Sequence, residues 1–223
     1  MSENLDKIHR NVARLLAEVP PHVTIVAACK TRSVEEVEAA YVAGLRHFGH
    51  NYVQEAQSML PKLSFHADWH LIGHLQRNKV GLALRLFQIV QTLDSLQLTE
   101  ELEKKCTLQN ITLPVLLEIN SGYEDSKSGI LPEEVDELVK SVSHSPHLRL
   151  EGLMTMGPRF GDAQKARPFF QTTRKIFEHL SLPKIPNVNM RFLSMGMSNS
   201  YREAIEEGAT MIRLGSAIFG ERG

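Results

Sequence analysis

Cysteine is scarce in this chain, since Cys29 and Cys106 are the only two among 223 residues. Two thiols are too few for a disulfide framework or a cysteine-rich zinc site. An excess of charge of one sign is also missing, because 25 Lys and Arg stand against 26 Asp and Glu, which argues against a broad nucleic-acid-binding surface. The longest apolar runs, such as residues 23–29, fall far short of the roughly 20 residues of a membrane span. The polar N-terminus does not resemble a signal peptide, so a cytoplasmic location is expected.

Hydrophobic residues make up 42% of the chain and charged residues 23%, a composition typical of a folded globular protein. Apolar residues within 1–19 recur at three- and four-residue spacing, which predicts an amphipathic helix at the N-terminus. Beyond this helix, short apolar segments alternate with helical ones. We expect eight strands, over residues 23–29, 45–49, 69–73, 87–92, 114–120, 148–154, 191–196 and 210–215.

This alternation predicts an α/β fold, a single (β/α)8 TIM barrel with an extra N-terminal helix, in which residues 1–223 form one domain. Each unit from Val23 onward has roughly 25 residues, near the lower limit for such barrels. A Rossmann-like open sheet is the alternative, but the first strand is not followed by G-x-G-x-x-G, and the chain has no Walker A sequence. Two capping boxes are predicted, Ser33 with Glu36 and Ser200 with Glu203.

Lys30 is the most unusual residue at the C-terminal ends of the expected strands, where barrels carry their active sites. Strand alternation points Lys30 into the barrel together with Ala28, while Cys29 faces the helices as a small buried residue. Desolvation lowers the pKa of an amine and exposes the lone pair that Schiff-base chemistry requires. An ordinary strand-end lysine that reaches solvent is the competing interpretation.

Two turns rich in small residues follow the seventh and eighth expected strands. Ser194 to Ser200 reads S-M-G-M-S-N-S, and Ile212 to Ser216 reads I-R-L-G-S. Free backbone N–H groups at such turns bind anions, and many barrels hold phosphate in these two loops. Together with Arg213, the turns predict a phosphate site, although simple helix capping also accounts for the first turn.

The histidines do not predict a metal site. His66, His70 and His74 recur every four residues, which would suit a metal on a helix, but residues 69–73 are expected to be a strand. The polar loop over residues 121–129 is a candidate lid over the barrel mouth.

Seven segments carry a family resemblance along nearly the whole chain. They are A-C-K-T at 28–31, F-G-H-N-Y-V-Q-E at 48–55, W-H-L-I-G-H-L-Q-R-N-K at 69–79, S-K-S-G-I at 126–130, E-G-L-M at 151–154, L-S-M-G-M-S at 193–198 and I-R-L-G-S-A-I-F-G-E-R at 212–222. In this combination the chain resembles the pyridoxal 5'-phosphate (PLP) homeostasis proteins. The resemblance implies a barrel similar to the N-terminal domain of alanine racemase, PLP fold type III.

The resemblance also implies a cofactor, PLP, held covalently on Lys30 as an internal Schiff base. Ser198, Gly215 and Ser216 are the residues that it implies for the phosphate. The chain departs from the family pattern at His50, where an acidic residue is usual, and at Asn199-Ser200, where an aspartate is usual. His50 thereby removes a negative charge that is expected near the barrel mouth.

Three further residues are expected at the cofactor on the same grounds. Asn51 is implied as a partner of the phenolic oxygen of the ring, and Ser194 is placed among the cofactor-binding residues. Arg213 is implied beside the pyridine nitrogen. Because arginine keeps its proton, it would leave that nitrogen unprotonated and weaken the electron sink that carbanion chemistry uses.

We therefore expect a PLP carrier or regulator with no catalytic residues and no robust turnover. Tyr52, Tyr123 and Tyr201 fall in helices or loops, so no tyrosine is expected beside Lys30 as a second acid or base. The chain also ends just past the eighth strand, without the added domain of the racemases. Its role would be intracellular PLP homeostasis, in which it buffers PLP or delivers it.

The expected partners are PLP and PLP-dependent apoenzymes, without nucleic acid or membrane, and the expected state is a monomer. Two alternatives remain open. One is a small PLP-dependent amino-acid racemase or decarboxylase, and the other is a phosphosugar-type barrel enzyme that uses Lys30 without PLP.

Overall fold

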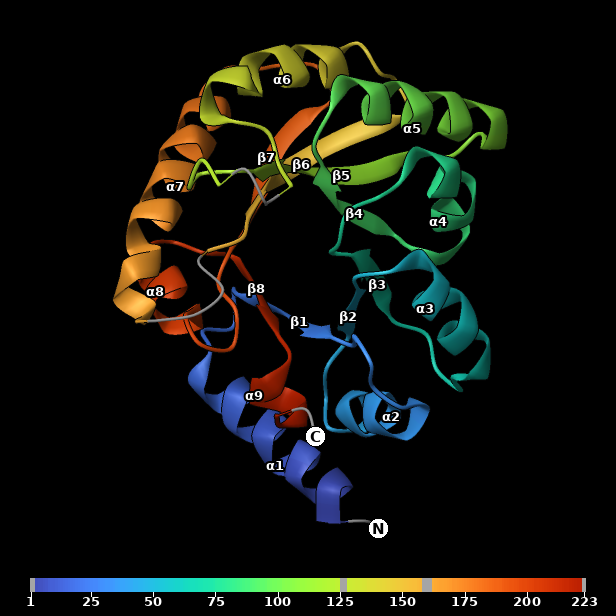
Figure 1. Ribbon diagram of the computed structural model, residues 1–223, viewed down its shortest axis with the longest axis vertical. Helices are drawn as coiled ribbons and strands as arrows, with labels where there is room; N and C mark the ends of the chain where they lie inside the picture. The colour runs from blue at the N-terminus through green and yellow to red at the C-terminus, as the bar shows by residue number, and fades with distance from the viewer. Residues whose placement is uncertain (1–2, 125–127, 158–161, 222–223) are drawn as a thin grey trace.

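Eight parallel strands close into a barrel in a computed structural model that describes residues 3–124, 128–157 and 162–221. The strands follow one another around the barrel in chain order, and helices surround them (Figure 1). The predicted (β/α)8 barrel is confirmed, and the open-sheet alternative is wrong. The strands are β1 Thr24–Ala28, β2 His47–His50, β3 Asp68–Leu71, β4 Ile89–Leu93, β5 Leu113–Ile119, β6 Leu148–Thr155, β7 Val188–Ser194 and β8 Met211–Leu214.

The helices alternate with these strands, apart from the first. They are α1 Glu3–Glu18, α2 Val34–Val42, α3 Val53–Met59, α4 Val80–Leu86, α5 Leu96–Gln109, α6 Val135–Ser143, α7 Arg167–Ser181, α8 Tyr201–Glu206 and α9 Ser216–Phe219. Short 3-10 helices are η1 Leu60–Lys62, η2 Arg77–Lys79, η3 Pro132–Glu134 and η4 Ala163–Ala166. The extra helix α1 packs across α2 and α9, so the two ends of the described chain lie close together (Figure 1). Among the described residues, no helix has the length and apolar character to cross a membrane.

The two predicted capping boxes have different outcomes. At α2, Glu36 N donates to Ser33 Oγ at 3.3 Å and Ser33 N donates to Glu36 Oε2 at 2.8 Å, which confirms the first box. At α8 the prediction is wrong, because the side chain of Ser200 accepts no hydrogen bond from the helix. The reason is local: Ser200 has φ −146° and ψ 12°, away from the extended conformation that turns a capping side chain toward the helix. Its hydroxyl instead accepts a bond from Met197 N, in the preceding turn, at 3.4 Å.

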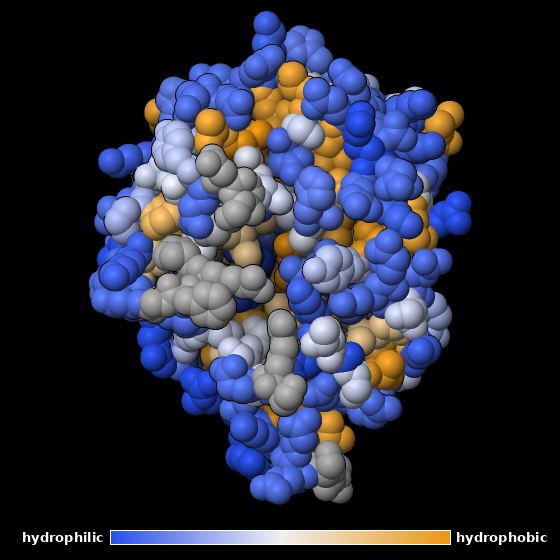
Figure 2. Space-filling model, viewed as in Figure 1, coloured by the Kyte–Doolittle hydropathy of each residue, from blue (hydrophilic) through white to orange (hydrophobic). Residues whose placement is uncertain are grey.

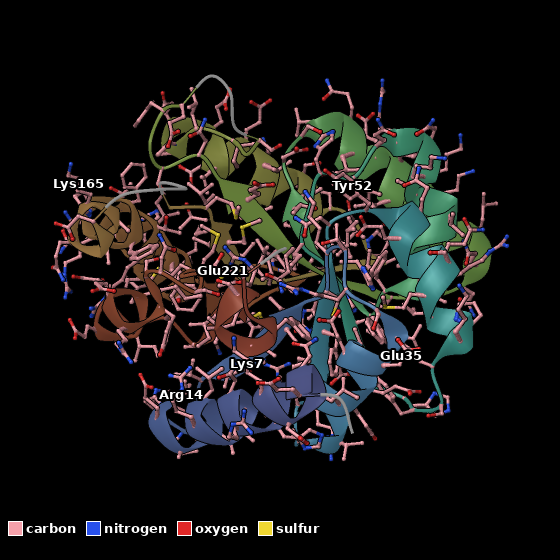
Figure 3. The ribbon with its side chains drawn as sticks, turned by 60° about the horizontal axis from the view of Figure 1, so that its bottom comes forward. Lys7, Arg14, Glu35, Tyr52, Lys165 and Glu221 are labelled. Atoms are coloured by element: carbon pink, nitrogen blue, oxygen red, sulfur yellow. The ribbon has the colours of Figure 1, made fainter. Side chains whose placement is uncertain are left out.

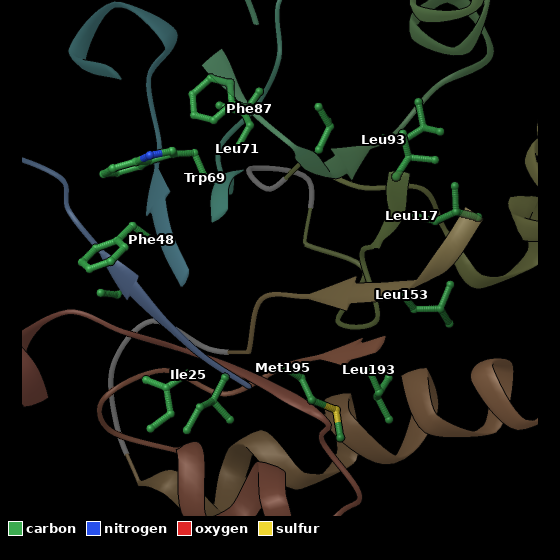
Figure 4. Packing of buried hydrophobic residues seen from close by; sticks show 14 of the residues in the cluster. Ile25, Phe48, Trp69, Leu71, Phe87, Leu93, Leu117, Leu153, Leu193 and Met195 are labelled. Atoms are coloured by element: carbon green, nitrogen blue, oxygen red, sulfur yellow. The ribbon is translucent and has the colours of Figure 1, made fainter. Parts of the chain in front are cut away.

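The apolar core forms a shell between the barrel and its helices (Figure 4). Ile25, Ala27 and Cys29 face this shell, and Cys29 is fully buried there. Burial raises the pKa of the Cys29 thiol, as its prediction as a small apolar residue requires. Ala28 and Lys30 take the opposite, inward face by alternation, which brings Lys30 to the open end of the barrel.

Gly152 lets β6 and β7 approach closely at an irregularity in their pairing. Its φ is +156°, and a Cβ atom there would lie 1.8 Å from the carbonyl oxygen of Phe192. Only glycine fits such a contact with a neighbouring backbone, which explains why a glycine stands in the E-G-L-M segment.

Candidate functional site

The barrel mouth brings together the residues that were expected to bind the cofactor. Lys30 follows β1, Asn51 follows β2, Ser198 lies between β7 and α8, and Gly215 with Ser216 follows β8. Because all strands are parallel, these positions meet at one end of the barrel. The molecular surface is hollowed where the barrel axis reaches this face (Figure 2).

Lys30 contacts a tyrosine. Lys30 Nζ donates to Tyr52 Oη at 3.4 Å and lies 4.9 Å from the centre of the tyrosine ring. Tyr52 precedes α3 (Figure 3). It is 50% exposed, so the contact is open to solvent. Within the described part of the chain, no carboxylate forms an ion pair with this ammonium. The amine of Lys30 is therefore half-buried, accessible and not neutralised by a fixed counter-ion.

The expectation that no tyrosine lies beside Lys30 is wrong. The pairing of β1 with β2 aligns Ala28 with Gly49, so Lys30 is level with Asn51. Tyr52 comes one residue later and leans over the end of the neighbouring strand. The sequence pattern places Tyr52 in a loop after the second strand. The register of β1 and β2 is needed to see that this loop brings Tyr52 to Lys30.

Asn51 is held in place by a backbone contact. A Cβ atom on Gly73, in the loop after β3, would lie 2.3 Å from the carbonyl oxygen of Asn51. The two turns therefore touch through main-chain atoms. The side-chain amide of Asn51 has no hydrogen bond to another described residue, which leaves it available to a ligand.

The turns after β7 and β8 are joined by one hydroxyl. Ser198 Oγ accepts hydrogen bonds from Gly215 N and Ala217 N, both at 3.1 Å. Two backbone donors thus converge on one oxygen, the arrangement that binds an anionic oxygen. A Cβ atom on Gly215 would come no closer than 3.8 Å to Ala28, so the space beside Gly215 is open. The hydroxyl of Ser216 has no partner among the described residues.

Arg213 lies deeper, inside the barrel, and is 4% exposed. Its Nη1 donates to Ser194 Oγ at 2.6 Å and its Nη2 donates to Thr155 O at 2.9 Å. Burial lowers the pKa of Arg213 to about 10, which still leaves the guanidinium charged at neutral pH. Ser194 is fully buried beneath Arg213. Ser194 therefore contacts Arg213 here, and its direct contact with the cofactor stays a prediction.

Glu118 is a buried carboxyl that the sequence reasoning missed. It lies on β5, is 5% exposed, and its Oε2 has no hydrogen-bond partner among the described residues. Burial first, and then the charge of Asp94, raise the pKa of Glu118 to about 7 against the opposing effect of Arg213. A single acid in the apolar segment L-L-E-I-N was the available signal. This carboxyl holds or releases a proton near neutral pH.

His50 faces away from the barrel mouth. It is fully buried and stacks on Trp69, with ring centroids 5.6 Å apart and planes at 21°. Neither ring nitrogen has a hydrogen-bond partner among the described residues, and a carboxylate oxygen of Glu55 lies 3.9 Å from Nδ1. Burial lowers the pKa of His50 to about 4. His50 is thus neutral and packs in the outer shell, so the loss of a negative charge at this position stays a prediction and does not concern the interior of the barrel.

The remaining candidates do not form a metal centre. His70 lies inside the barrel, whereas His74 is at the surface, with its Nδ1 3.0 Å from Asp94 Oδ2. In the described ranges, no three His, Cys, Asp or Glu side chains come together as possible ligands. Residues 125–127, in the candidate lid and the S-K-S-G-I segment, lie outside the described residues.

The family comparison covers nearly the whole chain. Residues 4–223 match the family described as alanine racemase, N-terminal domain. A pyridoxal phosphate homeostasis protein of Helicobacter pylori is 39% identical over 202 residues, covering 89% of this chain and 88% of the relative. A protein of the same name from Pasteurella multocida is 36% identical, covering 100% of this chain and 97% of the relative.

Solved structures show the same barrel. PipY of Synechococcus elongatus, solved with PLP bound, has a TM-score of 0.87 and 30% identity, covering 96% of this chain and 100% of that one. Alanine racemase of Clostridium difficile has a TM-score of 0.78 at 14% identity, and the match covers 99% of this chain but 57% of the racemase. The second likeness concerns the fold alone.

The buried, neutral His50 predicts a loss of stability in acid. Below its ordinary pKa of 6.5, His50 takes up a proton in the unfolded chain, whereas the folded chain resists this down to about pH 4. The contribution of His50 to the free energy of unfolding is thus fully present above pH 6.5. It is lost as the pH falls toward 4, with a limiting slope of about 1.4 kcal/mol per pH unit. Urea unfolding across this range should give a shallower pH dependence for His50→Phe than for wild type.

The exposed His22 supplies the matched control, because His22→Gln should keep the wild-type slope. The comparison depends on slopes, so it holds whatever the absolute stability of either variant. Equal slopes for wild type and His50→Phe would show that His50 does not resist protonation in the folded state.

Proposed function

The chain belongs to the family of pyridoxal phosphate homeostasis proteins, and on this premise we propose that it holds PLP as a Schiff base on Lys30 and buffers or delivers it. The observation that carries the proposal is the amine of Lys30, at the barrel mouth and without a carboxylate partner among the described residues. We further propose one PLP-binding domain over residues 1–223, acting as a cytoplasmic monomer. PLP-dependent apoenzymes are the proposed recipients.

The residues at the mouth suit such a ligand. PLP supplies an aldehyde that condenses with amines and a ring that withdraws electrons. Lys30 offers the amine, and the tyrosine hydroxyl 3.4 Å from Nζ provides a place where a proton can pass to solvent. The amides of Gly215 and Ala217 converge on a single acceptor position, which supports their role, with Ser198 and Ser216, toward the phosphate.

Arg213 and Asn51 complete the proposed site. Arg213 has five N–H donors and uses part of them beneath the mouth, so others remain for a ring nitrogen. A charged guanidinium in that position leaves the nitrogen unprotonated, which favours holding the cofactor over carbanion chemistry. Asn51 has a free amide for the phenolic oxygen.

A small PLP-dependent racemase or decarboxylase is the second candidate function. The contact of Tyr52 with Lys30 favours it, because a tyrosine within hydrogen-bond reach is one of the groups used for general acid–base catalysis. Glu118 adds a carboxyl that titrates near neutral pH. We rank this candidate second because the charged Arg213 disfavours carbanion chemistry.

Lys30→Ala tests the attachment. Wild type incubated with PLP should absorb near the wavelength of a Schiff base, and borohydride reduction should trap one adduct on the peptide that contains Lys30. Lys30→Ala should lose both signals because it has no amine at this position. Lys62→Ala, which removes an exposed lysine on η1, is the matched control and should retain both. A wild-type protein that takes up no PLP would refute the proposal.

Amino-acid turnover separates the two candidate functions. Holo-protein incubated with single amino acids should give no racemisation or decarboxylation beyond one equivalent per site, as measured by chiral chromatography and release of CO₂. Sustained turnover that disappears in Tyr52→Phe would establish the enzyme and overturn the carrier. Turnover unaffected by Tyr52→Phe would overturn the carrier and assign no role to this tyrosine.

Ser198→Ala combined with Ser216→Ala tests the phosphate assignment. Each lost charge-assisted hydrogen bond should cost about 1.5–3 kcal/mol, so PLP should bind at least tenfold more weakly. Pyridoxal, which lacks the phosphate, should bind wild type and the double variant equally well. Unchanged PLP affinity in a double variant with a native circular dichroism spectrum would contradict the assignment.

A further inference from the structure

A row of polar side chains crosses the barrel interior beneath Arg213, and we call these residues the interior chain. Ser194 Oγ accepts from Arg213 Nη1 at 2.6 Å and donates to Gln91 Oε1 at 2.7 Å. Gln91 Nε2 lies 2.9 Å from His70 Nδ1, and His70 Nε2 lies 3.3 Å from His47 Nδ1. Arg213, Ser194, Gln91 and His70 are buried, whereas His47 reaches partial exposure at the far end of the barrel.

The permanent charge of Arg213 fixes the first bond of the interior chain, because an arginine only donates and Ser194 Oγ must accept from it. The orientation of the Gln91 amide fixes the others: its Oε1 faces Ser194, whose hydroxyl donates to it. The amide NH₂ of Gln91 then faces His70, whose Nδ1 must be the unprotonated acceptor. His70 therefore carries its proton on Nε2 and donates it toward His47.

Two further observations agree with this assignment. Gln91 Nε2 also lies 3.2 Å from Met211 Sδ, a weak acceptor that suits the NH₂ end of the amide. Burial, with a smaller contribution from the neighbouring His47, lowers the pKa of His70 to about 3, so His70 is neutral as the interior chain requires. From Arg213 to His70 the donors and acceptors match, and the last acceptor, His47 Nδ1, also lies 3.4 Å from Asp68 Oδ2 at the far end of the barrel.

The interior chain holds Arg213 without neutralising it. Within the described residues, no carboxylate forms an ion pair with Arg213, and its partners Ser194 Oγ, Thr155 O and Met156 Sδ are all uncharged. A carboxylate partner would fix the guanidinium but also cancel its charge. Neutral acceptors fix its orientation and leave the charge available above them.

We propose that Ser194 and Gln91 are positioning residues for the cofactor site, which act by fixing the guanidinium of Arg213 in the orientation that meets the ring nitrogen. The inference rests on the proposed binding of PLP at Lys30. Ser194 touches Arg213 directly, and Gln91 orients the Ser194 hydroxyl. Loss of either weakens the hold on Nη1 and leaves Arg213 fixed only through Nη2, to Thr155 O and Met156 Sδ, so its donors are less well aligned with the ring nitrogen.

The cofactor-free protein offers the first test. Nitrogen-15 NMR should find His70 with its proton on Nε2 in wild type. In Ser194→Ala the amide of Gln91 loses the donor that orients it, so it can turn its oxygen to His70 and the Nδ1–H form should appear. Ser194→Thr, which restores a hydroxyl, should return His70 to the wild-type form. An Nδ1–H form of His70 in wild type would overturn the donor-to-acceptor direction assigned to the hydrogen bonds of the interior chain.

The PLP-loaded protein offers the second test. Ser194→Ala and Gln91→Leu should each weaken PLP retention about tenfold and shift the absorbance maximum, because one oriented hydrogen bond is lost. In an Arg213→Lys background, the same two substitutions should add less than a twofold change, since they act through Arg213. Thr99→Ala, which removes another buried hydroxyl, should leave the spectrum unchanged.

Borohydride trapping on Lys30 separates failure of this inference from failure of the proposed function. No trapped adduct in wild type refutes PLP binding itself. A normal adduct in wild type with unchanged retention and spectrum in Gln91→Leu and Ser194→Ala overturns the positioning role. Effects that persist undiminished in the Arg213→Lys background also overturn it, because Arg213 would then not be the intermediary.

Discussion

A closed barrel of parallel strands leaves each strand side chain two surroundings, the apolar shell under the helices or the interior that all strands share. Alternation along β1 sends Ile25 and Ala27 into the shell and brings Lys30 to the mouth. The same rule makes residues from distant parts of the sequence neighbours. Gln91 on β4 and Ser194 on β7, 103 residues apart, share a hydrogen bond because both point inward.

The shared interior also controls charge. The side chain of Arg213 is almost inaccessible to solvent, so the protein must supply the dipoles that water would otherwise provide. Hydroxyl, carbonyl and thioether groups do so, and Glu118, whose pKa burial raises to about 7, exchanges its proton near neutral pH. The guanidinium of Arg213 is thus buried without an ion pair to a described carboxylate, and Lys30 lies above it at the mouth.

Sequence patterns predicted what depends on neighbours in the chain. Apolar periodicity gave all eight strands, and the Ser33 box was correct because a capping box is set by four consecutive residues. The capping box predicted at Ser200 is absent because the preceding turn determines the backbone angles of Ser200. The contacts of Tyr52 and Gln91 could not be predicted, since they depend on strand register and on side chains from other strands. The sequence brought Lys30, Gly215 and Ser216 to the correct end of the barrel, but their roles rest on the family resemblance.

The contact between Gly73 and Asn51 has a mechanical consequence. Because main-chain atoms of the two turns touch with no room for a methyl group, neither turn can shift toward the other, and any displacement of the loop after β3 in that direction is transmitted to Asn51. That loop continues into η2, whose residues Arg77 and Asn78 line a surface groove of about 740 Å³ beside α5. Main-chain atoms thus link the loop that leads to this groove with Asn51 at the barrel mouth.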